Sequence, residues 1–539
     1  MYDELPLHTV NDVLDHAAQR FGDRIALVDG PSRYTFRDLH AQVLQASGGL
    51  RALGVRPGDR VALWLPNRVE WCVAFYAAVR AGAIVVPLNT GLSVPEATYQ
   101  LAQSGSTVVV TADEYRSRRL ADDALAISGA ADRAFRVVVV GARVPDGALS
   151  WHDVASAPPA PGSPVPPAPD DPVVMLYTSG TTGRPKGAVH THRFLPSLLS
   201  ARRRLELSEE DCVVLYLPLY HVYALMAGLV LMTAAGAKLV LMERFDAAGS
   251  LQLMAAERAT LVYGVPTTYI DQLAAPAIDA TDLSSVRVSI TPFPYDLCQR
   301  VSARFGVCLN CFGMTETASM ALLPRLDDPP ETAMGTVGTP LDGLEARVVD
   351  EATGTSAPAG YPGALQLRGP LIMKEYWDKP ADTARAFAPD GWFRTGDIAQ
   401  LDQYGNVTFI GRQGDHYRVG GESVDPVEVE AALQTHPLVA RAAVLGVPDA
   451  RLGHVGHAWV QPHRGADVID VDALRAYIAS RLAFFKVPRS IDFIDQLPTT
   501  PSGKVQKYKL QALLEDAGRE PSGATRTKPD ETPVVADAP

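Results

Sequence analysis

One short segment of the chain concentrates side chains that can bind phosphate. Residues 178–187 read TSGTTGRPKG and lie between the strand-like VVMLY and a helix-like stretch that starts at Thr191. Three glycines, four hydroxyl side chains and one lysine can surround a polyphosphate with backbone N–H groups, hydroxyls and an ammonium. Pro185 occupies the position where the P-loop of NTPases needs its second glycine, so we predict a phosphate loop of another kind. The predicted contacts are Thr178, Ser179, Gly180, Thr181, Thr182, Gly183 and Lys186.

Three further candidates lie in separate loops. Glu316 follows Thr315 in a glycine-bounded loop, and a carboxylate there suits Mg²⁺ that is shared with phosphate. Asp397 follows the strand-like WFRT and a glycine, where an exposed carboxylate either accepts hydrogen bonds from the two hydroxyls of a ribose or is a plain turn residue. Lys504 lies among Pro, Thr, Ser and Gly, and its type alone predicts only a solvated lysine.

Together these segments resemble the adenylate-forming superfamily, which comprises acyl-CoA synthetases, peptide-synthetase adenylation domains and firefly-type luciferases. The resemblance extends to about Leu510, in the order of the family's motifs: TSGTTGRPKG from 178, FGMTE from 312, GWFRTGD from 391, GRQGD from 411 and PTTPSGK from 498. It implies that Asp397 and Arg412 bind the ribose and that Thr315 contacts the α-phosphate. It also implies that Glu316 holds Mg²⁺ and that Lys504 is the catalytic lysine.

The resemblance implies an AMP-forming acid–thiol ligase that uses ATP, Mg²⁺ and coenzyme A. A hydrophobic carboxylic acid attacks the α-phosphorus of ATP, pyrophosphate leaves, and the thiol of coenzyme A then displaces AMP. Both partners of the first step are anions, so we expect Lys504, Mg²⁺ and Lys186 to supply positive charge. The alternatives are an enzyme that loads a carrier protein or performs mainly one half-reaction, and a non-catalytic acyl-nucleotide binder.

An acyl pocket is implied by the same resemblance. No Asp occurs in LPLYHVYAL, residues 217–225, where amino-acid-activating relatives place the carboxylate that binds the α-ammonium, so we expect an acid without an α-amine. Ser289, Ile290 and Thr291 replace a Gly-rich stretch of the relatives and predict a reshaped pocket or a shifted base. The acid itself stays open. The expected pocket residues are Tyr220, His221, Tyr223, Gly264, Val265, Phe312, Gly313 and Met314.

The elements that position these residues alternate between helix-like and strand-like patterns. This alternation runs through the first 150 residues and again over residues 173–290, and it predicts an α/β fold with two parallel-rich sheets. Residues 335–410 are rich in strand patterns with glycine-bounded turns and predict a small β-barrel. We expect a large N-terminal domain over 1–413, a small mobile α+β C-terminal domain over 414–517 and a disordered tail over 518–539. The resemblance implies a hinge at Gly414, which withdraws Lys504 after adenylation.

The composition argues against several other classes of protein. Lys plus Arg number 49 against 61 Asp plus Glu, a formal net charge of -12 at pH 7, which disfavours bulk binding to nucleic acid or to an anionic membrane. The uncharged stretch between Asp211 and Lys238 is interrupted by Pro218, so we predict a buried strand and helix instead of a membrane span. Five scattered cysteines and an acidic N-terminus predict a reduced cytoplasmic protein. A homodimer is left open.

Overall fold

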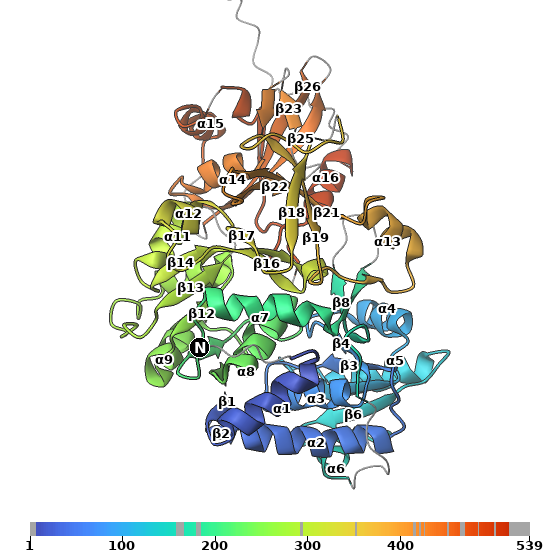
Figure 1. The fold of residues 1–539 in the computed structure, drawn as a ribbon. Helices are drawn as coiled ribbons and strands as arrows, with labels where there is room; N and C mark the ends of the chain where they lie inside the picture. Colours follow the sequence, from blue (N-terminus) through green and yellow to red (C-terminus); the bar gives the residue numbers. More distant parts are fainter. Residues whose placement is uncertain are drawn as a thin grey trace, which may run out of the picture. The chain divides into compact units, whose positions relative to one another are not determined.

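Two compact units make up the chain. The computed structural model describes residues 7–157, 166–178, 185–291, 295–350, 353–412, 417–419, 422–424, 426–449, 452–463, 469–482, 484–500 and 503–516. The units are Met1–Phe409 and Ile410–Pro539, and the second is drawn in orange and red in Figure 1. The expected domain boundary at 413/414 falls a few residues after this division, next to residues 413–416, which lie outside the described part of the chain.

The larger sheet of the first unit is built mainly from parallel strands. Its order is β20-β9-β8-β4-β3-β5-β6-β7, and every side chain of β4 and β5 is buried, as expected when helices cover both faces. β9 runs antiparallel to β8, and β20 runs antiparallel to β9. The strands are β3 (Arg60–Trp64), β4 (Ile84–Pro87), β5 (Val108–Ala112), β6 (Arg136–Val140), β7 (Leu149–Ser150), β8 (Pro172–Thr178), β9 (Lys186–Thr191) and β20 (Glu375–Tyr376).

A second parallel-rich sheet has the order β14-β13-β12-β10-β11-β1-β2, so the predicted pair of parallel-rich sheets is confirmed. Only β2 runs antiparallel to its neighbour among the pairings of these described strands. The strands are β1 (Ile25–Asp29), β2 (Ser32–Thr35), β10 (Cys212–Leu215), β11 (Lys238–Leu241), β12 (Leu261–Tyr263), β13 (Val288–Thr291) and β14 (Val307–Asn310).

Helices connect these strands, and α2 packs against α1, α3 and α6. Figure 1 draws α1, α2 and α3 in blue and α6 in cyan. α1 and α2 each begin with a threonine cap and an aspartate three residues later, a capping box that satisfies the exposed N–H groups of the first turn. The helices are α1 (Val10–Phe21), α2 (Phe36–Ala52), α3 (Val69–Arg80), α4 (Val94–Ser104), α5 (Leu120–Ala130), α6 (Trp151–Ser156), α7 (Leu195–Arg204), α8 (Leu231–Ala235), α9 (Ala247–Glu257), α10 (Pro266–Ala274), α11 (Tyr295–Ser302), α12 (Pro330–Gly335) and α13 (Pro380–Ala386).

The expected β-barrel is not formed by the described residues. The strands are divided between two sheets, one of three strands and one of four. Backbone hydrogen bonds link the two sheets, from Val337 N to the Val407 carbonyl at 2.8 Å and from Val407 N to the Gly338 carbonyl at 2.9 Å. The three-stranded sheet has the order β15-β16-β17 and the four-stranded sheet has the order β18-β19-β21-β22. The strands are β15 (Phe312–Met314), β16 (Ser319–Leu323), β17 (Thr339–Pro340), β18 (Glu345–Val349), β19 (Pro362–Arg368), β21 (Phe393–Leu401) and β22 (Val407–Arg412).

The uncharged stretch after Asp211 is a buried strand followed by a helix of unusual form. Tyr223–Val230 is a π-helix, in which Leu231 N donates to the carbonyl of Met226 five residues earlier. The turn continues into α8 and ends at Gly236, with φ of 73°. Wide helical turns of this kind are rare and are frequently found at functional sites. No helix among the described residues is long and apolar enough to cross a bilayer.

The second unit has an α+β fold with a core of its own, as predicted. Its sheet has the order β24-β23-β26-β25, with β27 beside β26, and a separate apolar cluster includes Val424, Leu433 and Leu474. The predicted tail lies outside the described residues. The elements are β23 (Tyr417–Val419), β24 (Glu422–Val424), α14 (Pro426–Gln434), β25 (Val439–Asp449), β26 (Gly453–Pro462), α15 (Val471–Ala479), a 3₁₀ turn (Phe484–Lys486), β27 (Ser490–Phe493) and α16 (Lys507–Asp516).

Candidate functional site

The predicted phosphate loop connects two adjacent antiparallel strands. Thr178 is the last residue of β8 and Lys186 the first of β9, and the two are paired across the ladder. Both ends of the loop are therefore held by backbone hydrogen bonds of the sheet. Ser179, Gly180, Thr181, Thr182 and Gly183 lie outside the described residues, so their predicted phosphate contacts stay predictions.

Lys186 has two partners that the sequence did not suggest. Its Nζ lies 2.7 Å from Oδ1 of Asp382 and 5.2 Å from the centre of the Tyr376 ring. Asp382 also accepts a hydrogen bond from Arg385 at 2.8 Å. The hydrogen bond from Lys186 is the main cause that lowers the pKa of Asp382, so this carboxyl is ionised. These partners are almost 200 residues from Lys186 along the chain, where no sequence spacing relates them.

Glu316 is buried and held from one side. It lies in the 3₁₀ turn Thr315–Thr317 that joins β15 to β16, and its side chain is 4% exposed. The Tyr376 hydroxyl donates to its Oε1 at 2.7 Å, and Met373 N donates to its backbone carbonyl at 2.8 Å. Oε2 has no hydrogen bond to another described residue. Glu316 thus carries one oxygen fixed by Tyr376 and a second oxygen that can meet a cation.

The hairpin that carries Thr315 and Glu316 is tightly folded. Ala318 and Ser319 have φ of 47° and 97°, a backbone region that costs residues other than glycine free energy. A Cβ at Gly313 would lie 1.9 Å from the Ser319 carbonyl oxygen, so only glycine fits there. Thr317 Oγ1 accepts from Met314 N at 2.9 Å. Such strain is found where the surroundings hold a functional loop in one shape.

His190 is hydrogen-bonded to the same turn. Its Nε2 donates to the Thr315 carbonyl at 2.7 Å, and the side chain is 1% exposed. Burial lowers the pKa of His190 to about 4, so the ring is neutral near pH 7. Because Nε2 carries the proton, Nδ1 is an acceptor, and it has no partner among the described residues. No sequence pattern singled out His190.

Asp397 is buried, which corrects the expectation of an exposed turn carboxylate. It lies inside β21, which continues through the predicted turn to Leu401, and it is 2% exposed. Its backbone N donates to Thr395 Oγ1 at 3.1 Å, and that hydroxyl donates to the Leu365 carbonyl at 2.8 Å. These bonds orient the strand at Asp397. Arg412 ends β22, and its side chain lies outside the described part of the structure.

Several expected pocket residues converge at the carboxyl ends of β12, β13 and β14. Gly264 follows β12 and Phe312 follows β14, while β13 carries Ile290 between them. The Ile290 carbonyl accepts hydrogen bonds from Gly264 N at 3.2 Å and from the Tyr223 hydroxyl at 3.1 Å. The Tyr269 hydroxyl, which donates to the Val262 carbonyl at 3.0 Å, lies 3.4 Å from the same oxygen. Ligand sites in α/β sheets form at this edge of the strands. The Ile290 side chain itself is fully buried in the hydrophobic core.

Tyr220 and His221 form a neighbouring aromatic pair. Their ring centres are 4.8 Å apart, and burial lowers the pKa of His221 to about 4, so this ring is also neutral near pH 7. Tyr223 packs edge-on against Tyr263 at 5.6 Å. The remaining expected pocket residues are Val265, which precedes α10, and Gly313 and Met314, which belong to β15.

Lys504 belongs to the second unit, whereas Lys186, Glu316 and Asp397 belong to the first. It follows Gly503, whose φ is 83°, in a turn closed by Thr500 N, which donates to the Lys504 carbonyl at 2.8 Å. Arg441 donates to the Gly503 carbonyl at 2.9 Å. The Lys504 side chain is exposed. The predicted hinge, Gly414, lies outside the described residues.

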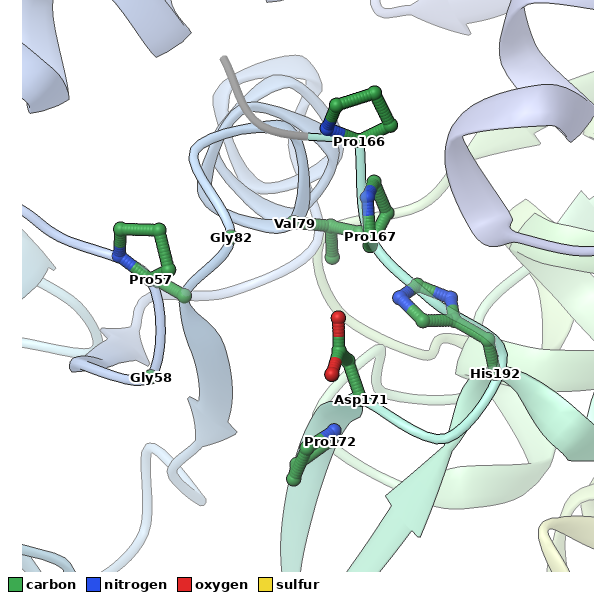
Figure 2. Close-up of a pocket in the computed structure, with 10 residues that line it drawn as sticks. Pro57, Gly58, Val79, Gly82, Pro166, Pro167, Asp171, Pro172 and His192 are labelled. Atoms are coloured by element: carbon green, nitrogen blue, oxygen red, sulfur yellow. The ribbon is translucent and has the colours of Figure 1, made fainter.

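A cavity of about 300 Å³ lies at the amino ends of strands β3, β4 and β8 in the larger sheet. Figure 2 shows the ring of His192 and the carboxylate of Asp171 beside it. The Nδ1 of His192 accepts from Val10 N at 3.1 Å. None of the predicted site residues lines this cavity. Its lining comprises Pro57, Gly58, Val79, Gly82, Ala83, Pro166, Pro167, Asp171, Pro172 and His192.

Comparisons with known proteins agree with the motifs. The model of the AMP-binding enzyme family matches residues 14–377, and that of the AMP-binding enzyme C-terminal domain matches residues 428–504. A feruloyl-CoA synthase of Amycolatopsis sp is 38% identical over 492 residues, which cover 90% of this chain and 95% of that protein.

Solved structures show the same likeness. ATP-bound MatB from Rhodopseudomonas palustris is 32% identical, with a TM-score of 0.84 over 95% of this chain and 100% of that one. The anthranilate CoA ligase AuaEII in complex with anthranoyl-AMP is 29% identical, with a TM-score of 0.87 over 95% of this chain and 99% of that one. The predicted superfamily is confirmed. The chain belongs to the AMP-binding enzyme family, as an ATP-dependent, AMP-forming acyl-CoA ligase.

Proposed function

We propose that this ligase activates an aromatic carboxylic acid that lacks an α-amino group. The observation that carries the proposal is the neutral aromatic group Tyr220, His221 and Tyr223, in which burial keeps the His221 ring uncharged. An α-ammonium would need an anionic partner, and residues 217–225 contain no carboxylate. Two proteins similar to this chain are named for aromatic acids, feruloyl and anthranilate.

The first chemical step joins two anions. A carboxylate oxygen attacks the α-phosphorus, and the bond from that phosphorus to the pyrophosphate oxygen breaks. We assign Lys186, Thr178 and the loop residues Ser179–Gly183 to the leaving phosphates, Thr315 to the α-phosphate, and Asp397 with Arg412 to the ribose. Lys504 supplies charge between the carboxylate and the α-phosphate in the transition state.

The carboxylate of Glu316 suits Mg²⁺. A hard carboxylate oxygen is the ligand that this ion prefers, and Oε1 is oriented by the Tyr376 hydroxyl at 2.7 Å. When bound, Mg²⁺ neutralises phosphate charge. The Glu316 carboxylate would hold this ion beside the phosphates, and His190 holds the adjoining Thr315 carbonyl in place.

The second step forms the thioester. The sulfur of coenzyme A attacks the activated carbonyl, and the bond from this carbonyl carbon to the AMP oxygen breaks. Since Lys504 and Glu316 belong to different units, we propose that the units turn about Gly414 between the two steps. The corresponding domains are 1–413 and 414–517, followed by the tail 518–539.

We also assign the enzyme to the cytoplasm. All five cysteines are buried thiols, as is usual for a protein kept under reducing conditions. The homodimer remains a prediction, which light scattering of the purified chain would check.

A panel of acids tests the proposed substrate class. ATP–pyrophosphate exchange should be fastest with aromatic acids, slower with medium-chain acids, and weakest with the matched α-amino acids. Thioester formation should then require coenzyme A. Exchange without a CoA-dependent thioester would favour loading of a carrier protein, and nucleotide binding without exchange for any acid would favour a non-catalytic binder.

Lys504→Ala tests the assigned catalytic lysine. We expect adenylation to slow about 100-fold or more, because a charge that acts in the transition state is lost, while the dissociation constant of MgATP changes little. Rapid-quench measurement of acyl-AMP and titration calorimetry give the two values. Lys509→Ala, in the same unit, is the control. An adenylation rate near that of wild type would remove Lys504 from the mechanism.

A further inference from the structure

A continuous series of contacts joins Lys186 to Glu316. The Lys186 ammonium lies 2.7 Å from Asp382 and 5.2 Å from the centre of the Tyr376 ring. The hydroxyl at the far end of that ring donates to Glu316 at 2.7 Å. Lys186, Asp382 and Glu316 are 19%, 18% and 4% exposed. One tyrosine therefore touches both the cation assigned to phosphate and the carboxylate assigned to Mg²⁺.

The backbone fixes this arrangement from several directions. β20 pairs with β9, with Tyr376 opposite Ala188, and Trp377 N donates to the Gly187 carbonyl at 2.8 Å. Tyr376 N donates to Thr383 Oγ1 at 3.0 Å, which ties α13 and its Asp382 to β20. Tyr376 and Asp382 thus belong to one segment, which is hydrogen-bonded to β9, the strand that begins at Lys186.

We propose that Asp382 and Tyr376 are positioning residues, which hold Lys186 and Glu316 at a set separation before MgATP binds. The inference rests on the proposed roles of Lys186 and Glu316. An ammonium has three donor hydrogens, and the bond to Asp382 uses one, so two remain for phosphate oxygens. Ordering a lysine side chain costs entropy. The Lys186–Asp382 ion pair orders much of the Lys186 side chain before the nucleotide binds.

The local charge is compatible with this role. Lys186 and Arg385 both pair with Asp382, so two cations and one anion leave a net positive charge for the phosphates. The opposite role, in which Asp382 competes with phosphate for Lys186, predicts tighter nucleotide binding once the carboxylate is removed. The two roles therefore predict opposite changes in the KM for MgATP when the Asp382 carboxylate is removed.

The variant Asp382→Asn distinguishes the two roles. With the best acid of the panel, we expect the KM for MgATP in pyrophosphate exchange to rise about threefold to tenfold, with kcat within about twofold of wild type. Asp382→Glu should restore part of the loss. The control is Asp170→Asn, which removes another aspartate–arginine pair, one that is well exposed. A KM that stays at the wild-type value or falls would overturn the proposal.

Tyr376→Phe separates the ring from the hydroxyl. The ring stays beneath Lys186, while Glu316 loses its donor. We expect the Mg²⁺ concentration for half-maximal exchange to rise about threefold or more, with the KM for ATP at saturating Mg²⁺ little changed. An unchanged Mg²⁺ dependence would remove Tyr376 from the proposal.

Lysine labelling gives a readout that needs no acid substrate. The full chain without nucleotide is treated with acetic anhydride and the modified lysines are quantified by mass spectrometry. Lys186 should react several times faster in Asp382→Asn than in wild type, with Lys509 as internal reference, and equal rates would overturn the proposal. A faster reaction in a protein that shows no exchange with any acid would support the Lys186–Asp382 pair while rejecting the proposed function.

Discussion

His190 shows how the surroundings of a single side chain set its charge. Its ring is buried, donates to the Thr315 carbonyl and has a pKa lowered to about 4 by burial. An unfolded histidine titrates near 6.5. Between these two values the unfolded chain binds a proton that the folded chain does not, so stability falls as the pH falls through this window.

We expect this histidine to contribute a loss of about 2 kcal/mol in unfolding free energy between pH 7 and pH 5. The variant His190→Gln should lack this loss of unfolding free energy between pH 7 and pH 5, whatever the substitution does to the unfolding free energy at pH 7. Urea unfolding of the first unit at both pH values measures it, and the exposed His152→Gln is the control. If the two variants lose the same free energy on acidification, His190 is not neutral in the folded state.

The sequence singled out candidate site residues by their type and local pattern, and their roles stay predictions. Thr315, Glu316, Asp397 and Lys504 all lie within motifs of a known family. It could not identify Asp382, Tyr376 and His190, because their roles come from the pairing of β20 with β9 and from burial. Neither property is encoded in a spacing that a reader of the chain can recognise.

At the scale of elements, the β15–β16 hairpin depends on one glycine. A Cβ at Gly313 would meet a backbone oxygen at 1.9 Å, and no side-chain rotation can relieve that contact. We expect Gly313→Ala to lower the unfolding free energy by about 3 kcal/mol and to slow adenylation, since the turn with Thr315 and Glu316 must shift.

Gly129→Ala is the matched control, because a Cβ at Gly129 in α5 meets nothing within 4 Å. Alanine there should leave the enzyme unchanged or stabilise it by up to about 1 kcal/mol. Urea unfolding and pyrophosphate exchange on both variants provide the comparison. A Gly313→Ala enzyme as stable and as active as Gly129→Ala would show that the hairpin can adapt.

The elements were predictable where hydrophobic patterns are long and regular. Alternating helices and strands indicated both parallel-rich sheets. The described strands do not form the expected closed barrel, because strand patterns report local extension and do not specify how distant strands pair. The π-helix at Tyr223–Val230 could not be foreseen either, since its all-apolar sequence has no periodicity to distinguish wide from ordinary turns.

The division into two units matters most at the scale of the whole molecule. Each unit has its own apolar core, and the assigned catalytic residues are split between them. The motifs predicted this division because the family resemblance covers both parts of the chain. The motif GRQGD also predicted the hinge at Gly414, which lies within residues 413–416, outside the described part of the structure.

Gly414→Pro tests that hinge. Proline restricts φ to about -65°, so we expect the two half-reactions to change unequally, with the ratio of adenylation rate to thioester rate shifting about tenfold or more. Gly414→Ala, which keeps the N–H and more backbone freedom, should shift this ratio less. Single-turnover assays of each step give the ratio. Equal slowing of both steps by proline would argue against a turn at this position.

The hydrogen bonds that Gly264 N and the Tyr223 hydroxyl donate to the Ile290 carbonyl bear on any effort to redesign this enzyme for bulkier acids. Trimming Tyr223 would enlarge the expected pocket, but it would also take away one anchor of the strand that underlies it. Mutant libraries are better directed at His221, since its side chain makes no hydrogen bond to the described parts of the protein, whereas Tyr220 has a side-chain hydrogen bond with Thr90.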